Sequence, residues 1–515
     1  MRGNRIPRRR GPGSRSVLVA AMMMLATTVP AASAADTPYL TTEPPLVTLQ
    51  PGVSGVVEAI INSGDTLGGF TFEGIPDGIG IRPSRFYEDA VEVYVSHEQS
   101  TVPFFGQADF QDASVSVLTL STADATRGSV LAAEVAIPAS AGFLRFCSAF
   151  MAGPAEGFSK YTYFANEESN DIIDVPDGAP YGPDPALGDQ RQAGYTVALN
   201  TETGEYQQIE SMGRLNHENT IALPGYSRIA MLTTDDTFSG PSAQLYLYLA
   251  GNESQLWNDQ GSLWAFRVTG TDSGRVKAQD AFNGANDYLD LEPGEVFTGE
   301  FIRVPQQIAR GDTELAPQDA LEQWSNENNV FQFIRLEDLA YDVNDPKVVY
   351  IADTGRSRVV PDPATGRLTR GPGGTVGQAD NGSVFVMEFD EDNPRKVNAF
   401  SVLAQGDDPS GDAFVAFTAP DNVGTSTASL MVQEDADNAK IWRMALATGS
   451  WSHVATVADP DGESSGIVDA SQWYGQGSWL LTVQAHGSNE SEEQVGDVLF
   501  KREDGQLLLM TIEGS

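Results

Sequence analysis

The sequence predicts an all-β protein, specifically a β-propeller with irregular insertions and one short helix. Short alternating or continuous apolar runs recur along most of the chain, each bounded by Gly, Asp, Asn or Pro, as is typical of antiparallel strands joined by turns. Little helical periodicity lies between these runs, and many short strands with few helices favour a propeller over a sandwich. The predicted strands are 91–95, 114–120, 128–137, 161–165, 229–233, 244–249, 261–268, 348–352, 382–389, 430–433, 441–445, 478–484 and 505–512.

A loose repeat marks the beginning of several predicted strands. Gly-Ser-Val-Leu at 128, Gly-Ser-Leu-Trp at 261, Gly-Ser-Val-Phe at 382 and Gly-Gln-Leu-Leu at 505 each follow a turn. The intervals are uneven, so insertions must separate the repeats. One insertion covers about 280–329 and holds the predicted helix, near 317–325, whose first turn contains proline.

Composition narrows the classes of partner. The 515 residues carry a formal net charge of -40, which repels phosphate backbones and anionic lipid, so neither nucleic acid nor a membrane is an expected partner of the mature protein. The same charge suits cation binding, although most of the acids are expected to form a solvated surface. Cys147 is the single cysteine of the chain, so the protein folds without an internal disulfide.

The N-terminus is typical of an export signal. Arginines crowd the first ten residues, an apolar stretch follows over 16–29, and Ala32-Ser33-Ala34 is a small-residue cleavage site. We expect residues 1–34 to be a signal peptide and the mature protein to be periplasmic or extracellular. The consecutive arginines permit twin-arginine export, while Gly11-Pro12-Gly13-Ser14 matches that signal poorly, so the Tat and Sec routes both stay open. Residues 35–64 are predicted as an N-terminal arm, ahead of a propeller domain over 65–515.

Acidic residues stand at the edges of several strand-like runs. If those strands belong to a closed or radial sheet, their carboxylates can converge on one axis, and such a cage suits calcium, which takes 6–8 oxygen ligands. The alternative is that they are solvated turn residues. The segments are Asn166-Glu167-Glu168, Asn216-His217-Glu218-Asn219, Thr234-Asp235-Asp236, Arg335-Leu336-Glu337-Asp338 and Pro420-Asp421-Asn422.

Arg335 and Glu337 lie two residues apart and therefore on one face of a strand. An arginine beside a metal-bound carboxylate would offer a planar bidentate fork to a phosphoryl oxygen. A cross-strand ion pair is the structural alternative.

Other catalytic motifs are absent or incomplete. The sequence contains no HExxH, CxxC, P-loop or helix-opening GxGxxG, which disfavours zinc sites and nucleotide-binding folds. Gly462-Glu463-Ser464-Ser465-Gly466 matches the letters of a nucleophile elbow, with Asp469 and His486 following in order. An elbow needs a strand before the serine and a helix after it; because a turn precedes this segment and no helical pattern follows, a serine nucleophile is disfavoured.

The motifs in order resemble the PhoX-type alkaline phosphatase family of exported bacterial β-propeller phosphatases, in a divergent branch. The likeness runs from about residue 65 to the C-terminus. It rests on the acidic segments above and on Gly74-Ile75-Pro76-Asp77-Gly78-Ile79-Gly80, Ser96-His97-Glu98, Arg145-Phe146-Cys147-Ser148-Ala149, Gly213-Arg214-Leu215, Glu463-Ser464-Ser465-Gly466 and Val483-Gln484-Ala485-His486.

The resemblance implies a phosphatase that hydrolyses small phosphate monoesters at an iron–calcium cluster, without a covalent protein nucleophile. It implies that Arg335 holds the substrate phosphate. Ser148-Ala149-Phe150-Met151 replaces the Gly-Gly and Pro-Trp-Gly that follow the cysteine in the better-known branch, so calcium is implied more directly than iron. The implied metal ligands are Cys147, Glu168 (or Glu167), Glu218, Asp236, Glu337, Asp421 and, on a shorter match, Glu463.

Other functions remain open. The carboxylates could belong to a non-catalytic, calcium-stabilised propeller that binds a partner or polymer, or to a calcium-dependent phosphodiesterase, a phytase-like hydrolase or a lactonase-like propeller. Cys147 and Arg335 discriminate, because a structural calcium site needs neither, whereas the phosphatase reading requires both beside the carboxylates. A monomer is expected.

Overall fold

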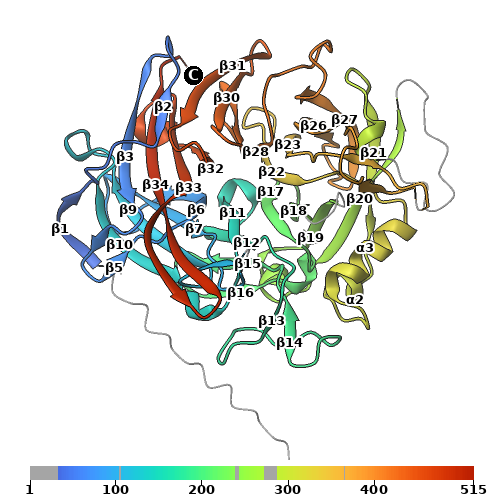
Figure 1. Ribbon diagram of the computed structural model, residues 1–515, viewed down its shortest axis with the longest axis horizontal. Helices are drawn as coiled ribbons and strands as arrows, with labels where there is room; N and C mark the ends of the chain where they lie inside the picture. Colours follow the sequence, from blue (N-terminus) through green and yellow to red (C-terminus); the bar gives the residue numbers. More distant parts are fainter. Residues whose placement is uncertain are drawn as a thin grey trace, which may run out of the picture. The chain divides into compact units, whose positions relative to one another are not determined.

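Six innermost strands form a closed ring around one axis (Figure 1). In the computed structural model each inner strand packs against the next, and the sixth packs against the first, which is the arrangement of a six-bladed propeller. The predicted all-β propeller is therefore confirmed. Residues 33–103, 106–237, 243–271, 287–364, 366–377 and 379–514 are described. The inner strands are β6 (Pro76–Pro83), β11 (Phe146–Ala152), β17 (His217–Ala222), β22 (Leu336–Tyr341), β28 (Pro420–Thr425) and β32 (Glu463–Asp469).

Each inner strand begins an antiparallel sheet that extends outward as a blade. Blades three and four share one nine-stranded sheet, because β21 (Phe297–Arg303) pairs with the outer strands of both. In the first three blades, the strands after the inner one are β7 (Ala90–His97), β9 (Ser114–Ser121), β10 (Val130–Ile137) and β1 (Ser33–Tyr39); β12 (Thr162–Glu167), β15 (Thr196–Asn200) and β16 (Tyr206–Gln208); and β18 (Ile229–Asp235), β19 (Leu245–Ala250) and β20 (Ser262–Thr271).

The last three blades follow the same plan. Three short hairpins form separate two-stranded sheets. Strand β8 (Gln107–Asp109) pairs in parallel with a strand of the last blade's sheet. The hairpins are β4 (Thr66–Leu67) with β5 (Phe70–Thr71), β13 (Ile172–Asp174) with β14 (Gln190–Gln192), and β24 (Val359–Pro361) with β25 (Leu368–Arg370). The blade strands are β23 (Val348–Asp353), β26 (Ser383–Phe389) and β27 (Lys396–Gln405); β29 (Ser429–Glu434), β30 (Lys440–Ala445), β31 (Ser450–Val457) and β2 (Val47–Leu49); and β33 (Ser478–Val495), β34 (Val498–Ile512) and β3 (Gly55–Asn62).

The segment 35–64, predicted as an arm, is instead integrated into three blades. It supplies β1, β2 and β3, which pair with β10, β31 and β34 at the outer edges of three sheets. An unpaired sheet edge presents free backbone donors and acceptors, so the N-terminal segment closes edges that the later chain leaves open. Of the predicted signal peptide, residues 1–32 lie outside the described part of the chain.

The core lies between the blades. Phe266, Phe331, Phe333, Phe385 and Phe400 form one aromatic cluster of blades three and four, with ring centroids 4.7 to 6.4 Å apart. All five side chains are buried. Such packing of rings adds to the free energy gained from apolar burial, so it holds the shared nine-stranded sheet in place.

The predicted helix is confirmed as α3 (Pro317–Glu327), with proline at its first turn and Ala320 and Leu321 buried on its inner face. The described residues also contain α1 (Glu253–Trp257), α2 (Gln306–Ala309) and α4 (Ser471–Tyr474). These helices are each about one turn long, too short for apolar periodicity to reveal. Within the described residues, no helix is both long enough and apolar enough to cross a membrane.

Candidate metal centre

Each of the six inner strands carries, at its first or second residue, a side chain of a type that can bind a metal ion. Because neighbouring inner strands enter the ring at the same end, these side chains meet there. Antiparallel pairing brings the residue that follows a blade's second strand to the same end. Glu98, Glu168, Asp236 and Asp435 hold this second position in blades one, two, three and five. The inner-strand residues are Asp77, Cys147, Glu218, Glu337, Asp421 and Glu463.

These side chains form a line of four overlapping groups, each with ligand atoms within 4.8 Å of one another. Cys147, Glu218 and Asp421 each belong to two groups, so they link the line. A carboxylate has two oxygens and can bridge neighbouring cations, so shared members suit a cluster of ions. The groups are Asp77, Glu98 and Cys147; Cys147, Glu168 and Glu218; Glu218, Glu337 and Asp421; and Asp421, Asp435 and Glu463.

Cys147 is buried between two carboxylates. Its Sγ lies 3.3 Å from Oδ2 of Asp77 and 3.4 Å from Oε1 of Glu218. Burial and the surrounding carboxylates raise the pKa of this thiol well above its ordinary value. Only a nearby cation could therefore hold it as a thiolate.

Two close backbone contacts place Asp77 beside the thiol. A Cβ at Gly78 would lie 2.2 Å from the Ala149 backbone nitrogen, so glycine permits β6 to approach β11. On the other side, Gly466 has φ +29°, and a Cβ there would lie 2.4 Å from the Asp77 carbonyl oxygen. The close approach of three inner strands thus depends on residues that lack a side chain.

Burial disfavours the charged form of these carboxyl groups. It raises the pKa of Asp77, Glu168, Glu218, Glu337 and Asp421 above the ordinary value, and the neighbouring carboxylates raise each further. Oδ1 of Asp77 and Oε2 of Glu218 are buried without a hydrogen-bond partner. Buried carboxylates are normally paired or bound to metal, so this donor set fits cations.

The donor types distinguish two kinds of cation. The carboxylate oxygens suit hard ions such as calcium, and a thiolate suits a softer ion such as iron. Both ends of the line hold carboxylates, whereas the sulfur belongs only to the first two groups. The residues present therefore fit a mixed cluster, with the softer ion near Cys147.

Arg335 lies beside the line of four groups, and two of its guanidinium nitrogens are hydrogen-bonded to Asp236. Nε and Nη2 of Arg335 donate to Asp236 at 3.0 and 2.6 Å, and Nη2 lies 3.1 Å from Oε1 of Glu337 without hydrogen-bond geometry. Although burial would lower the pKa of Arg335, both carboxylates raise it well above its ordinary value. Asp236 belongs to none of the four groups. In this structure it orients the arginine, and the expected bidentate fork is not available to a ligand.

Glu463, at one end of the line, contacts a histidine that is paired with a second glutamate. Its Oε1 lies 3.6 Å from Nε2 of His486, whose Nδ1 lies 2.5 Å from Oε2 of Glu503. Burial would lower the pKa of His486, but its interactions with the two glutamates raise it to about 11. The imidazolium therefore holds Glu463 in place from outside the line.

Glu167 and Glu168 have separate environments. Glu167 is buried and forms a bidentate pair with Arg191 at 2.7 and 2.9 Å, while Glu168 joins Cys147 and Glu218. The structure thus places Glu168 at the centre and Glu167 in a buried ion pair beneath it. The two residues are adjacent, so a one-residue difference at the end of β12 decides which one faces the axis.

Asp77, Glu98 and Asp435 join the groups although the sequence did not mark them as ligands. Asp77 and Glu98 stand in segments that carried the family resemblance. The signal that could have found all three is positional: they are the second residue of an inner strand or the first residue after the neighbouring strand. Gln484 supports this end, since its Nε2 donates to Asp77 at 2.7 Å and to Glu98 at 3.2 Å.

A polar layer lies directly beneath the carboxylates. Ser148 donates to Glu218 at 2.7 Å and accepts a hydrogen bond from Asn422 at 2.9 Å. Asp338 accepts the backbone N–H of Val423 at 2.8 Å. These residues line an axial cavity of about 160 Å³, so hydrogen bonds between blades support the centre from below.

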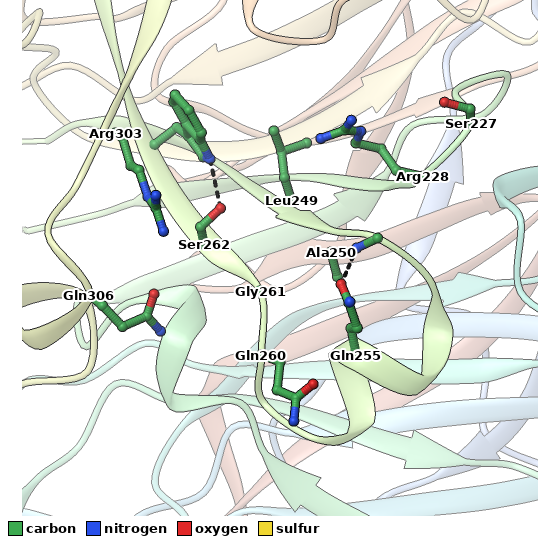
Figure 2. Close-up of a pocket in the computed structure, with 12 residues that line it drawn as sticks. Ser227, Arg228, Leu249, Ala250, Gln255, Gln260, Gly261, Ser262, Arg303 and Gln306 are labelled. Atoms are coloured by element: carbon green, nitrogen blue, oxygen red, sulfur yellow. Dashed lines mark hydrogen bonds between the residues drawn. The ribbon is translucent and has the colours of Figure 1, made fainter.

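A larger surface cavity lies away from the axis. It has a volume of about 440 Å³ and lies on outer strands of blade three, with Arg228, Arg303 and Trp264 in its lining (Figure 2). Its lining contains no aspartate, glutamate or cysteine. This cavity is therefore separate from the candidate metal centre despite its greater volume.

Residues 462–466 do not form a nucleophile elbow. Ser464 lies within strand β32, which runs from Glu463 to Asp469, whereas an elbow places the serine on a turn between a strand and a helix. His97 and His217 are also structural, since burial lowers their pKa to about 4 and about 3 and both rings are hydrogen-bonded.

No protein-family model and no curated protein sequence matches the chain. Among solved structures, the chain is similar to Pseudomonas fluorescens PhoX in complex with vanadate, a transition state analogue. The two share 14% identity over 94% of this chain and 98% of that chain, with a TM-score of 0.60. Two more distant neighbours are the apo soluble aldose sugar dehydrogenase of Escherichia coli (9% identity, 89% and 99% coverage, TM-score 0.34) and the β-propeller domain of Myceliophteria thermophila Cps50 (8%, 85% and 96%, 0.31). The chain thus has a PhoX-like fold.

Proposed function

We propose that this protein is an exported, metal-dependent phosphatase that hydrolyses phosphate monoesters, in a divergent branch of the PhoX-type family. One observation carries the proposal: a buried thiol and a half-buried arginine lie with the carboxylates at one end of the propeller axis. A structural calcium site needs only oxygen ligands. The presence of Cys147 and Arg335 together therefore favours the phosphatase over a calcium-stabilised binding propeller.

The carboxylates of the four groups would hold calcium, and Cys147 with Glu168 and Glu218 would hold iron. When bound, these ions supply Lewis-acid activation of a phosphate ester and reverse the local sign of charge in an acidic protein. Asp236 fixes the plane of Arg335, whose Nη1 donates no hydrogen bond to any described residue. That nitrogen can contact a phosphoryl oxygen and stabilise the charge that develops there.

The proposed setting follows from charge and the predicted export signal. The substrate is a small phosphate ester, reached outside the cytoplasm after removal of the signal peptide. The -40 net charge disfavours nucleic acid and membrane partners and is compatible with a monomer.

The test is turnover of an aryl phosphate by the exported protein, together with elemental analysis. We expect calcium and iron in the protein, turnover that chelation abolishes, and a large loss of kcat in Arg335→Ala. Arg303→Ala, on the outer strand β21 and exposed, is the matched control and should keep full activity. Calcium without turnover would instead favour the binding propeller, and turnover of diesters alone would favour the phosphodiesterase.

A further inference from the structure

A second arginine stands next to Arg335. Strand β23 pairs with β22 and ends at Asp353, and Arg356 follows three residues later. The Asp353 carboxylate accepts backbone N–H groups of Ile334, Arg335 and Gly355 at 2.9 to 3.2 Å. One buried side chain therefore fixes the backbone that leads to both arginines.

The loop that carries Arg356 is also held from the other side. Its backbone N–H donates to the Ala379 carbonyl at 2.8 Å. Gly355 adopts φ +71°, and a Cβ there would lie 2.4 Å from the same Ala379 oxygen. The backbone position of Arg356 is thus set by contacts on both sides of the loop.

The side chain of Arg356 has unused donors. Its Nε is buried without a hydrogen-bond partner, and within the described residues the guanidinium forms no ion pair. A buried donor left unpaired carries a free-energy penalty that a suitable acceptor would remove.

The electrostatic surroundings of Arg356 favour an anion. Burial lowers the pKa of Arg356, and the guanidinium groups of Arg335, Arg370 and Arg358 lower it further, while Asp236 acts in the opposite direction. Asp236, the carboxylate among these neighbours, is already engaged by Arg335. An anion placed between the arginines would relieve this repulsion.

Arg335 alone offers few free hydrogen-bond donors to a phosphate. Asp236 takes the donors of its Nε and Nη2, which leaves Nη1 as its free nitrogen. A phosphoryl group has three terminal oxygens in a monoester and two in a diester. A site with one free nitrogen would discriminate poorly between the two.

We propose that Arg356 is a second phosphate-contacting residue, which clamps the terminal phosphoryl group of a dianionic monoester together with Nη1 of Arg335. The inference rests on the proposed function and deepens it, because it assigns the preference for monoesters over diesters to this pair. Two guanidinium groups match a dianion in charge and supply planar donors to more than one oxygen.

The test compares the wild type, Arg356→Ala, Arg356→Lys and Arg370→Ala, all in calcium-loaded protein. Arg370 is the matched control. It is exposed, lies on β25 and donates to Ser357 at 3.3 Å, and its charge also acts on Arg356. Calorimetry measures the affinity for inorganic phosphate. Kinetics give kcat and KM for an aryl monoester and for a bis-aryl diester.

We expect Arg356→Ala to weaken phosphate binding by about 10- to 100-fold, the loss typical of a hydrogen bond to a charged group. KM for the monoester should rise by a similar factor, KM for the diester should change by less than about threefold, and Arg356→Lys should recover part of the loss. Arg370→Ala should stay within about threefold of the wild type. Metal content should not change.

Three results would overturn the inference. If the phosphate affinity of Arg356→Ala stays within about threefold of the wild type, the Arg356 side chain does not contact the anion. If Arg370→Ala loses as much phosphate affinity as Arg356→Ala, Arg356 contributes only to the overall positive potential of the site. If the wild type binds phosphate without turnover, the proposed function fails, and calorimetry alone still decides whether Arg356 contacts the anion. If metal-loaded wild type binds no phosphate, the inference fails as well.

Discussion

Replacing Glu218 with glutamine should change stability in opposite directions with and without calcium. Glu218 belongs to two of the four groups, and its Oε2 is buried without a partner. Its other oxygen accepts the hydroxyl of Ser148 at 2.7 Å. Glutamine keeps an oxygen for that hydrogen bond and removes a carboxyl group that has no cation beside it in metal-free protein.

The expected magnitudes follow from these contacts. Glutamine places an NH2 donor among carboxylates where the unsatisfied oxygen stood. Removing the cost of that buried, unsatisfied acceptor is worth about 1–3 kcal/mol, so metal-free Glu218→Gln should unfold at a higher temperature than the metal-free wild type. Calcium at about 100 times its Kd stabilises a one-site protein by about 2.7 kcal/mol. The variant should lose most of this gain, because both groups that share Glu218 lose a charged ligand.

Thermal unfolding with and without calcium measures both effects. Glu167→Gln is the matched control, because it removes the same charge from a glutamate one residue before Glu168 that pairs with Arg191. Breaking a buried pair typically costs about 3–5 kcal/mol, so this control should be less stable in both conditions while its calcium-induced rise in Tm stays equal to that of the wild type. An unchanged calcium effect in Glu218→Gln would show that the Glu218 carboxylate does not bind calcium.

Two other substitutions test the packing and the electrostatics around the centre. Gly78→Ala should lose metal and destabilise the fold by at least about 1–3 kcal/mol, the usual range for overpacking, because its Cβ would overlap the Ala149 backbone nitrogen; metal content and urea unfolding measure this, and unchanged calcium content would count against the close approach of β6 and β11. Burial raises the pKa of Asp109 from 3.8 to about 7, so the native state keeps a proton that the unfolded state releases, and stability falls as pH rises through that window. Asp109→Asn should therefore gain stability relative to the wild type between pH 4 and pH 8, by up to about 4 kcal/mol, and equal slopes of unfolding free energy against pH would contradict this.

Much of the architecture follows from the sequence because strand periodicity and turn residues are local. The strands and the helix at Pro317 depend on short-range patterns, whereas the convergence of Glu218, Glu337 and Asp421 also requires the ring of inner strands to close. The number of blades does not, because insertions and the sharing of β21 between two blades disrupt the repeat. The role of residues 35–64 was also not predicted, because an edge strand such as β3 is defined by pairing with a strand hundreds of residues away.

The candidate site, too, could be predicted from the sequence only in part. The sequence marked the ligand-bearing segments, but the choice between Glu167 and Glu168 depends on where β12 ends. The engagement of Arg335 by Asp236 joins blades three and four, and only the folded arrangement shows that the arginine's fork is occupied. Asp435 stands in an ordinary-looking loop, and its place beside Asp421 and Glu463 depends on three strands from two blades.

The metal centre is tested most simply by the metal content of the exported protein, measured by elemental analysis for the wild type and for Glu218→Gln after equilibration with calcium. We expect several tightly held ions in the wild type, with calcium prominent and iron present, and a clear loss of both in the variant. Wild-type protein that stays free of calcium and iron, or a variant with the same metal content, would contradict the claim that this line of carboxylates is a metal centre.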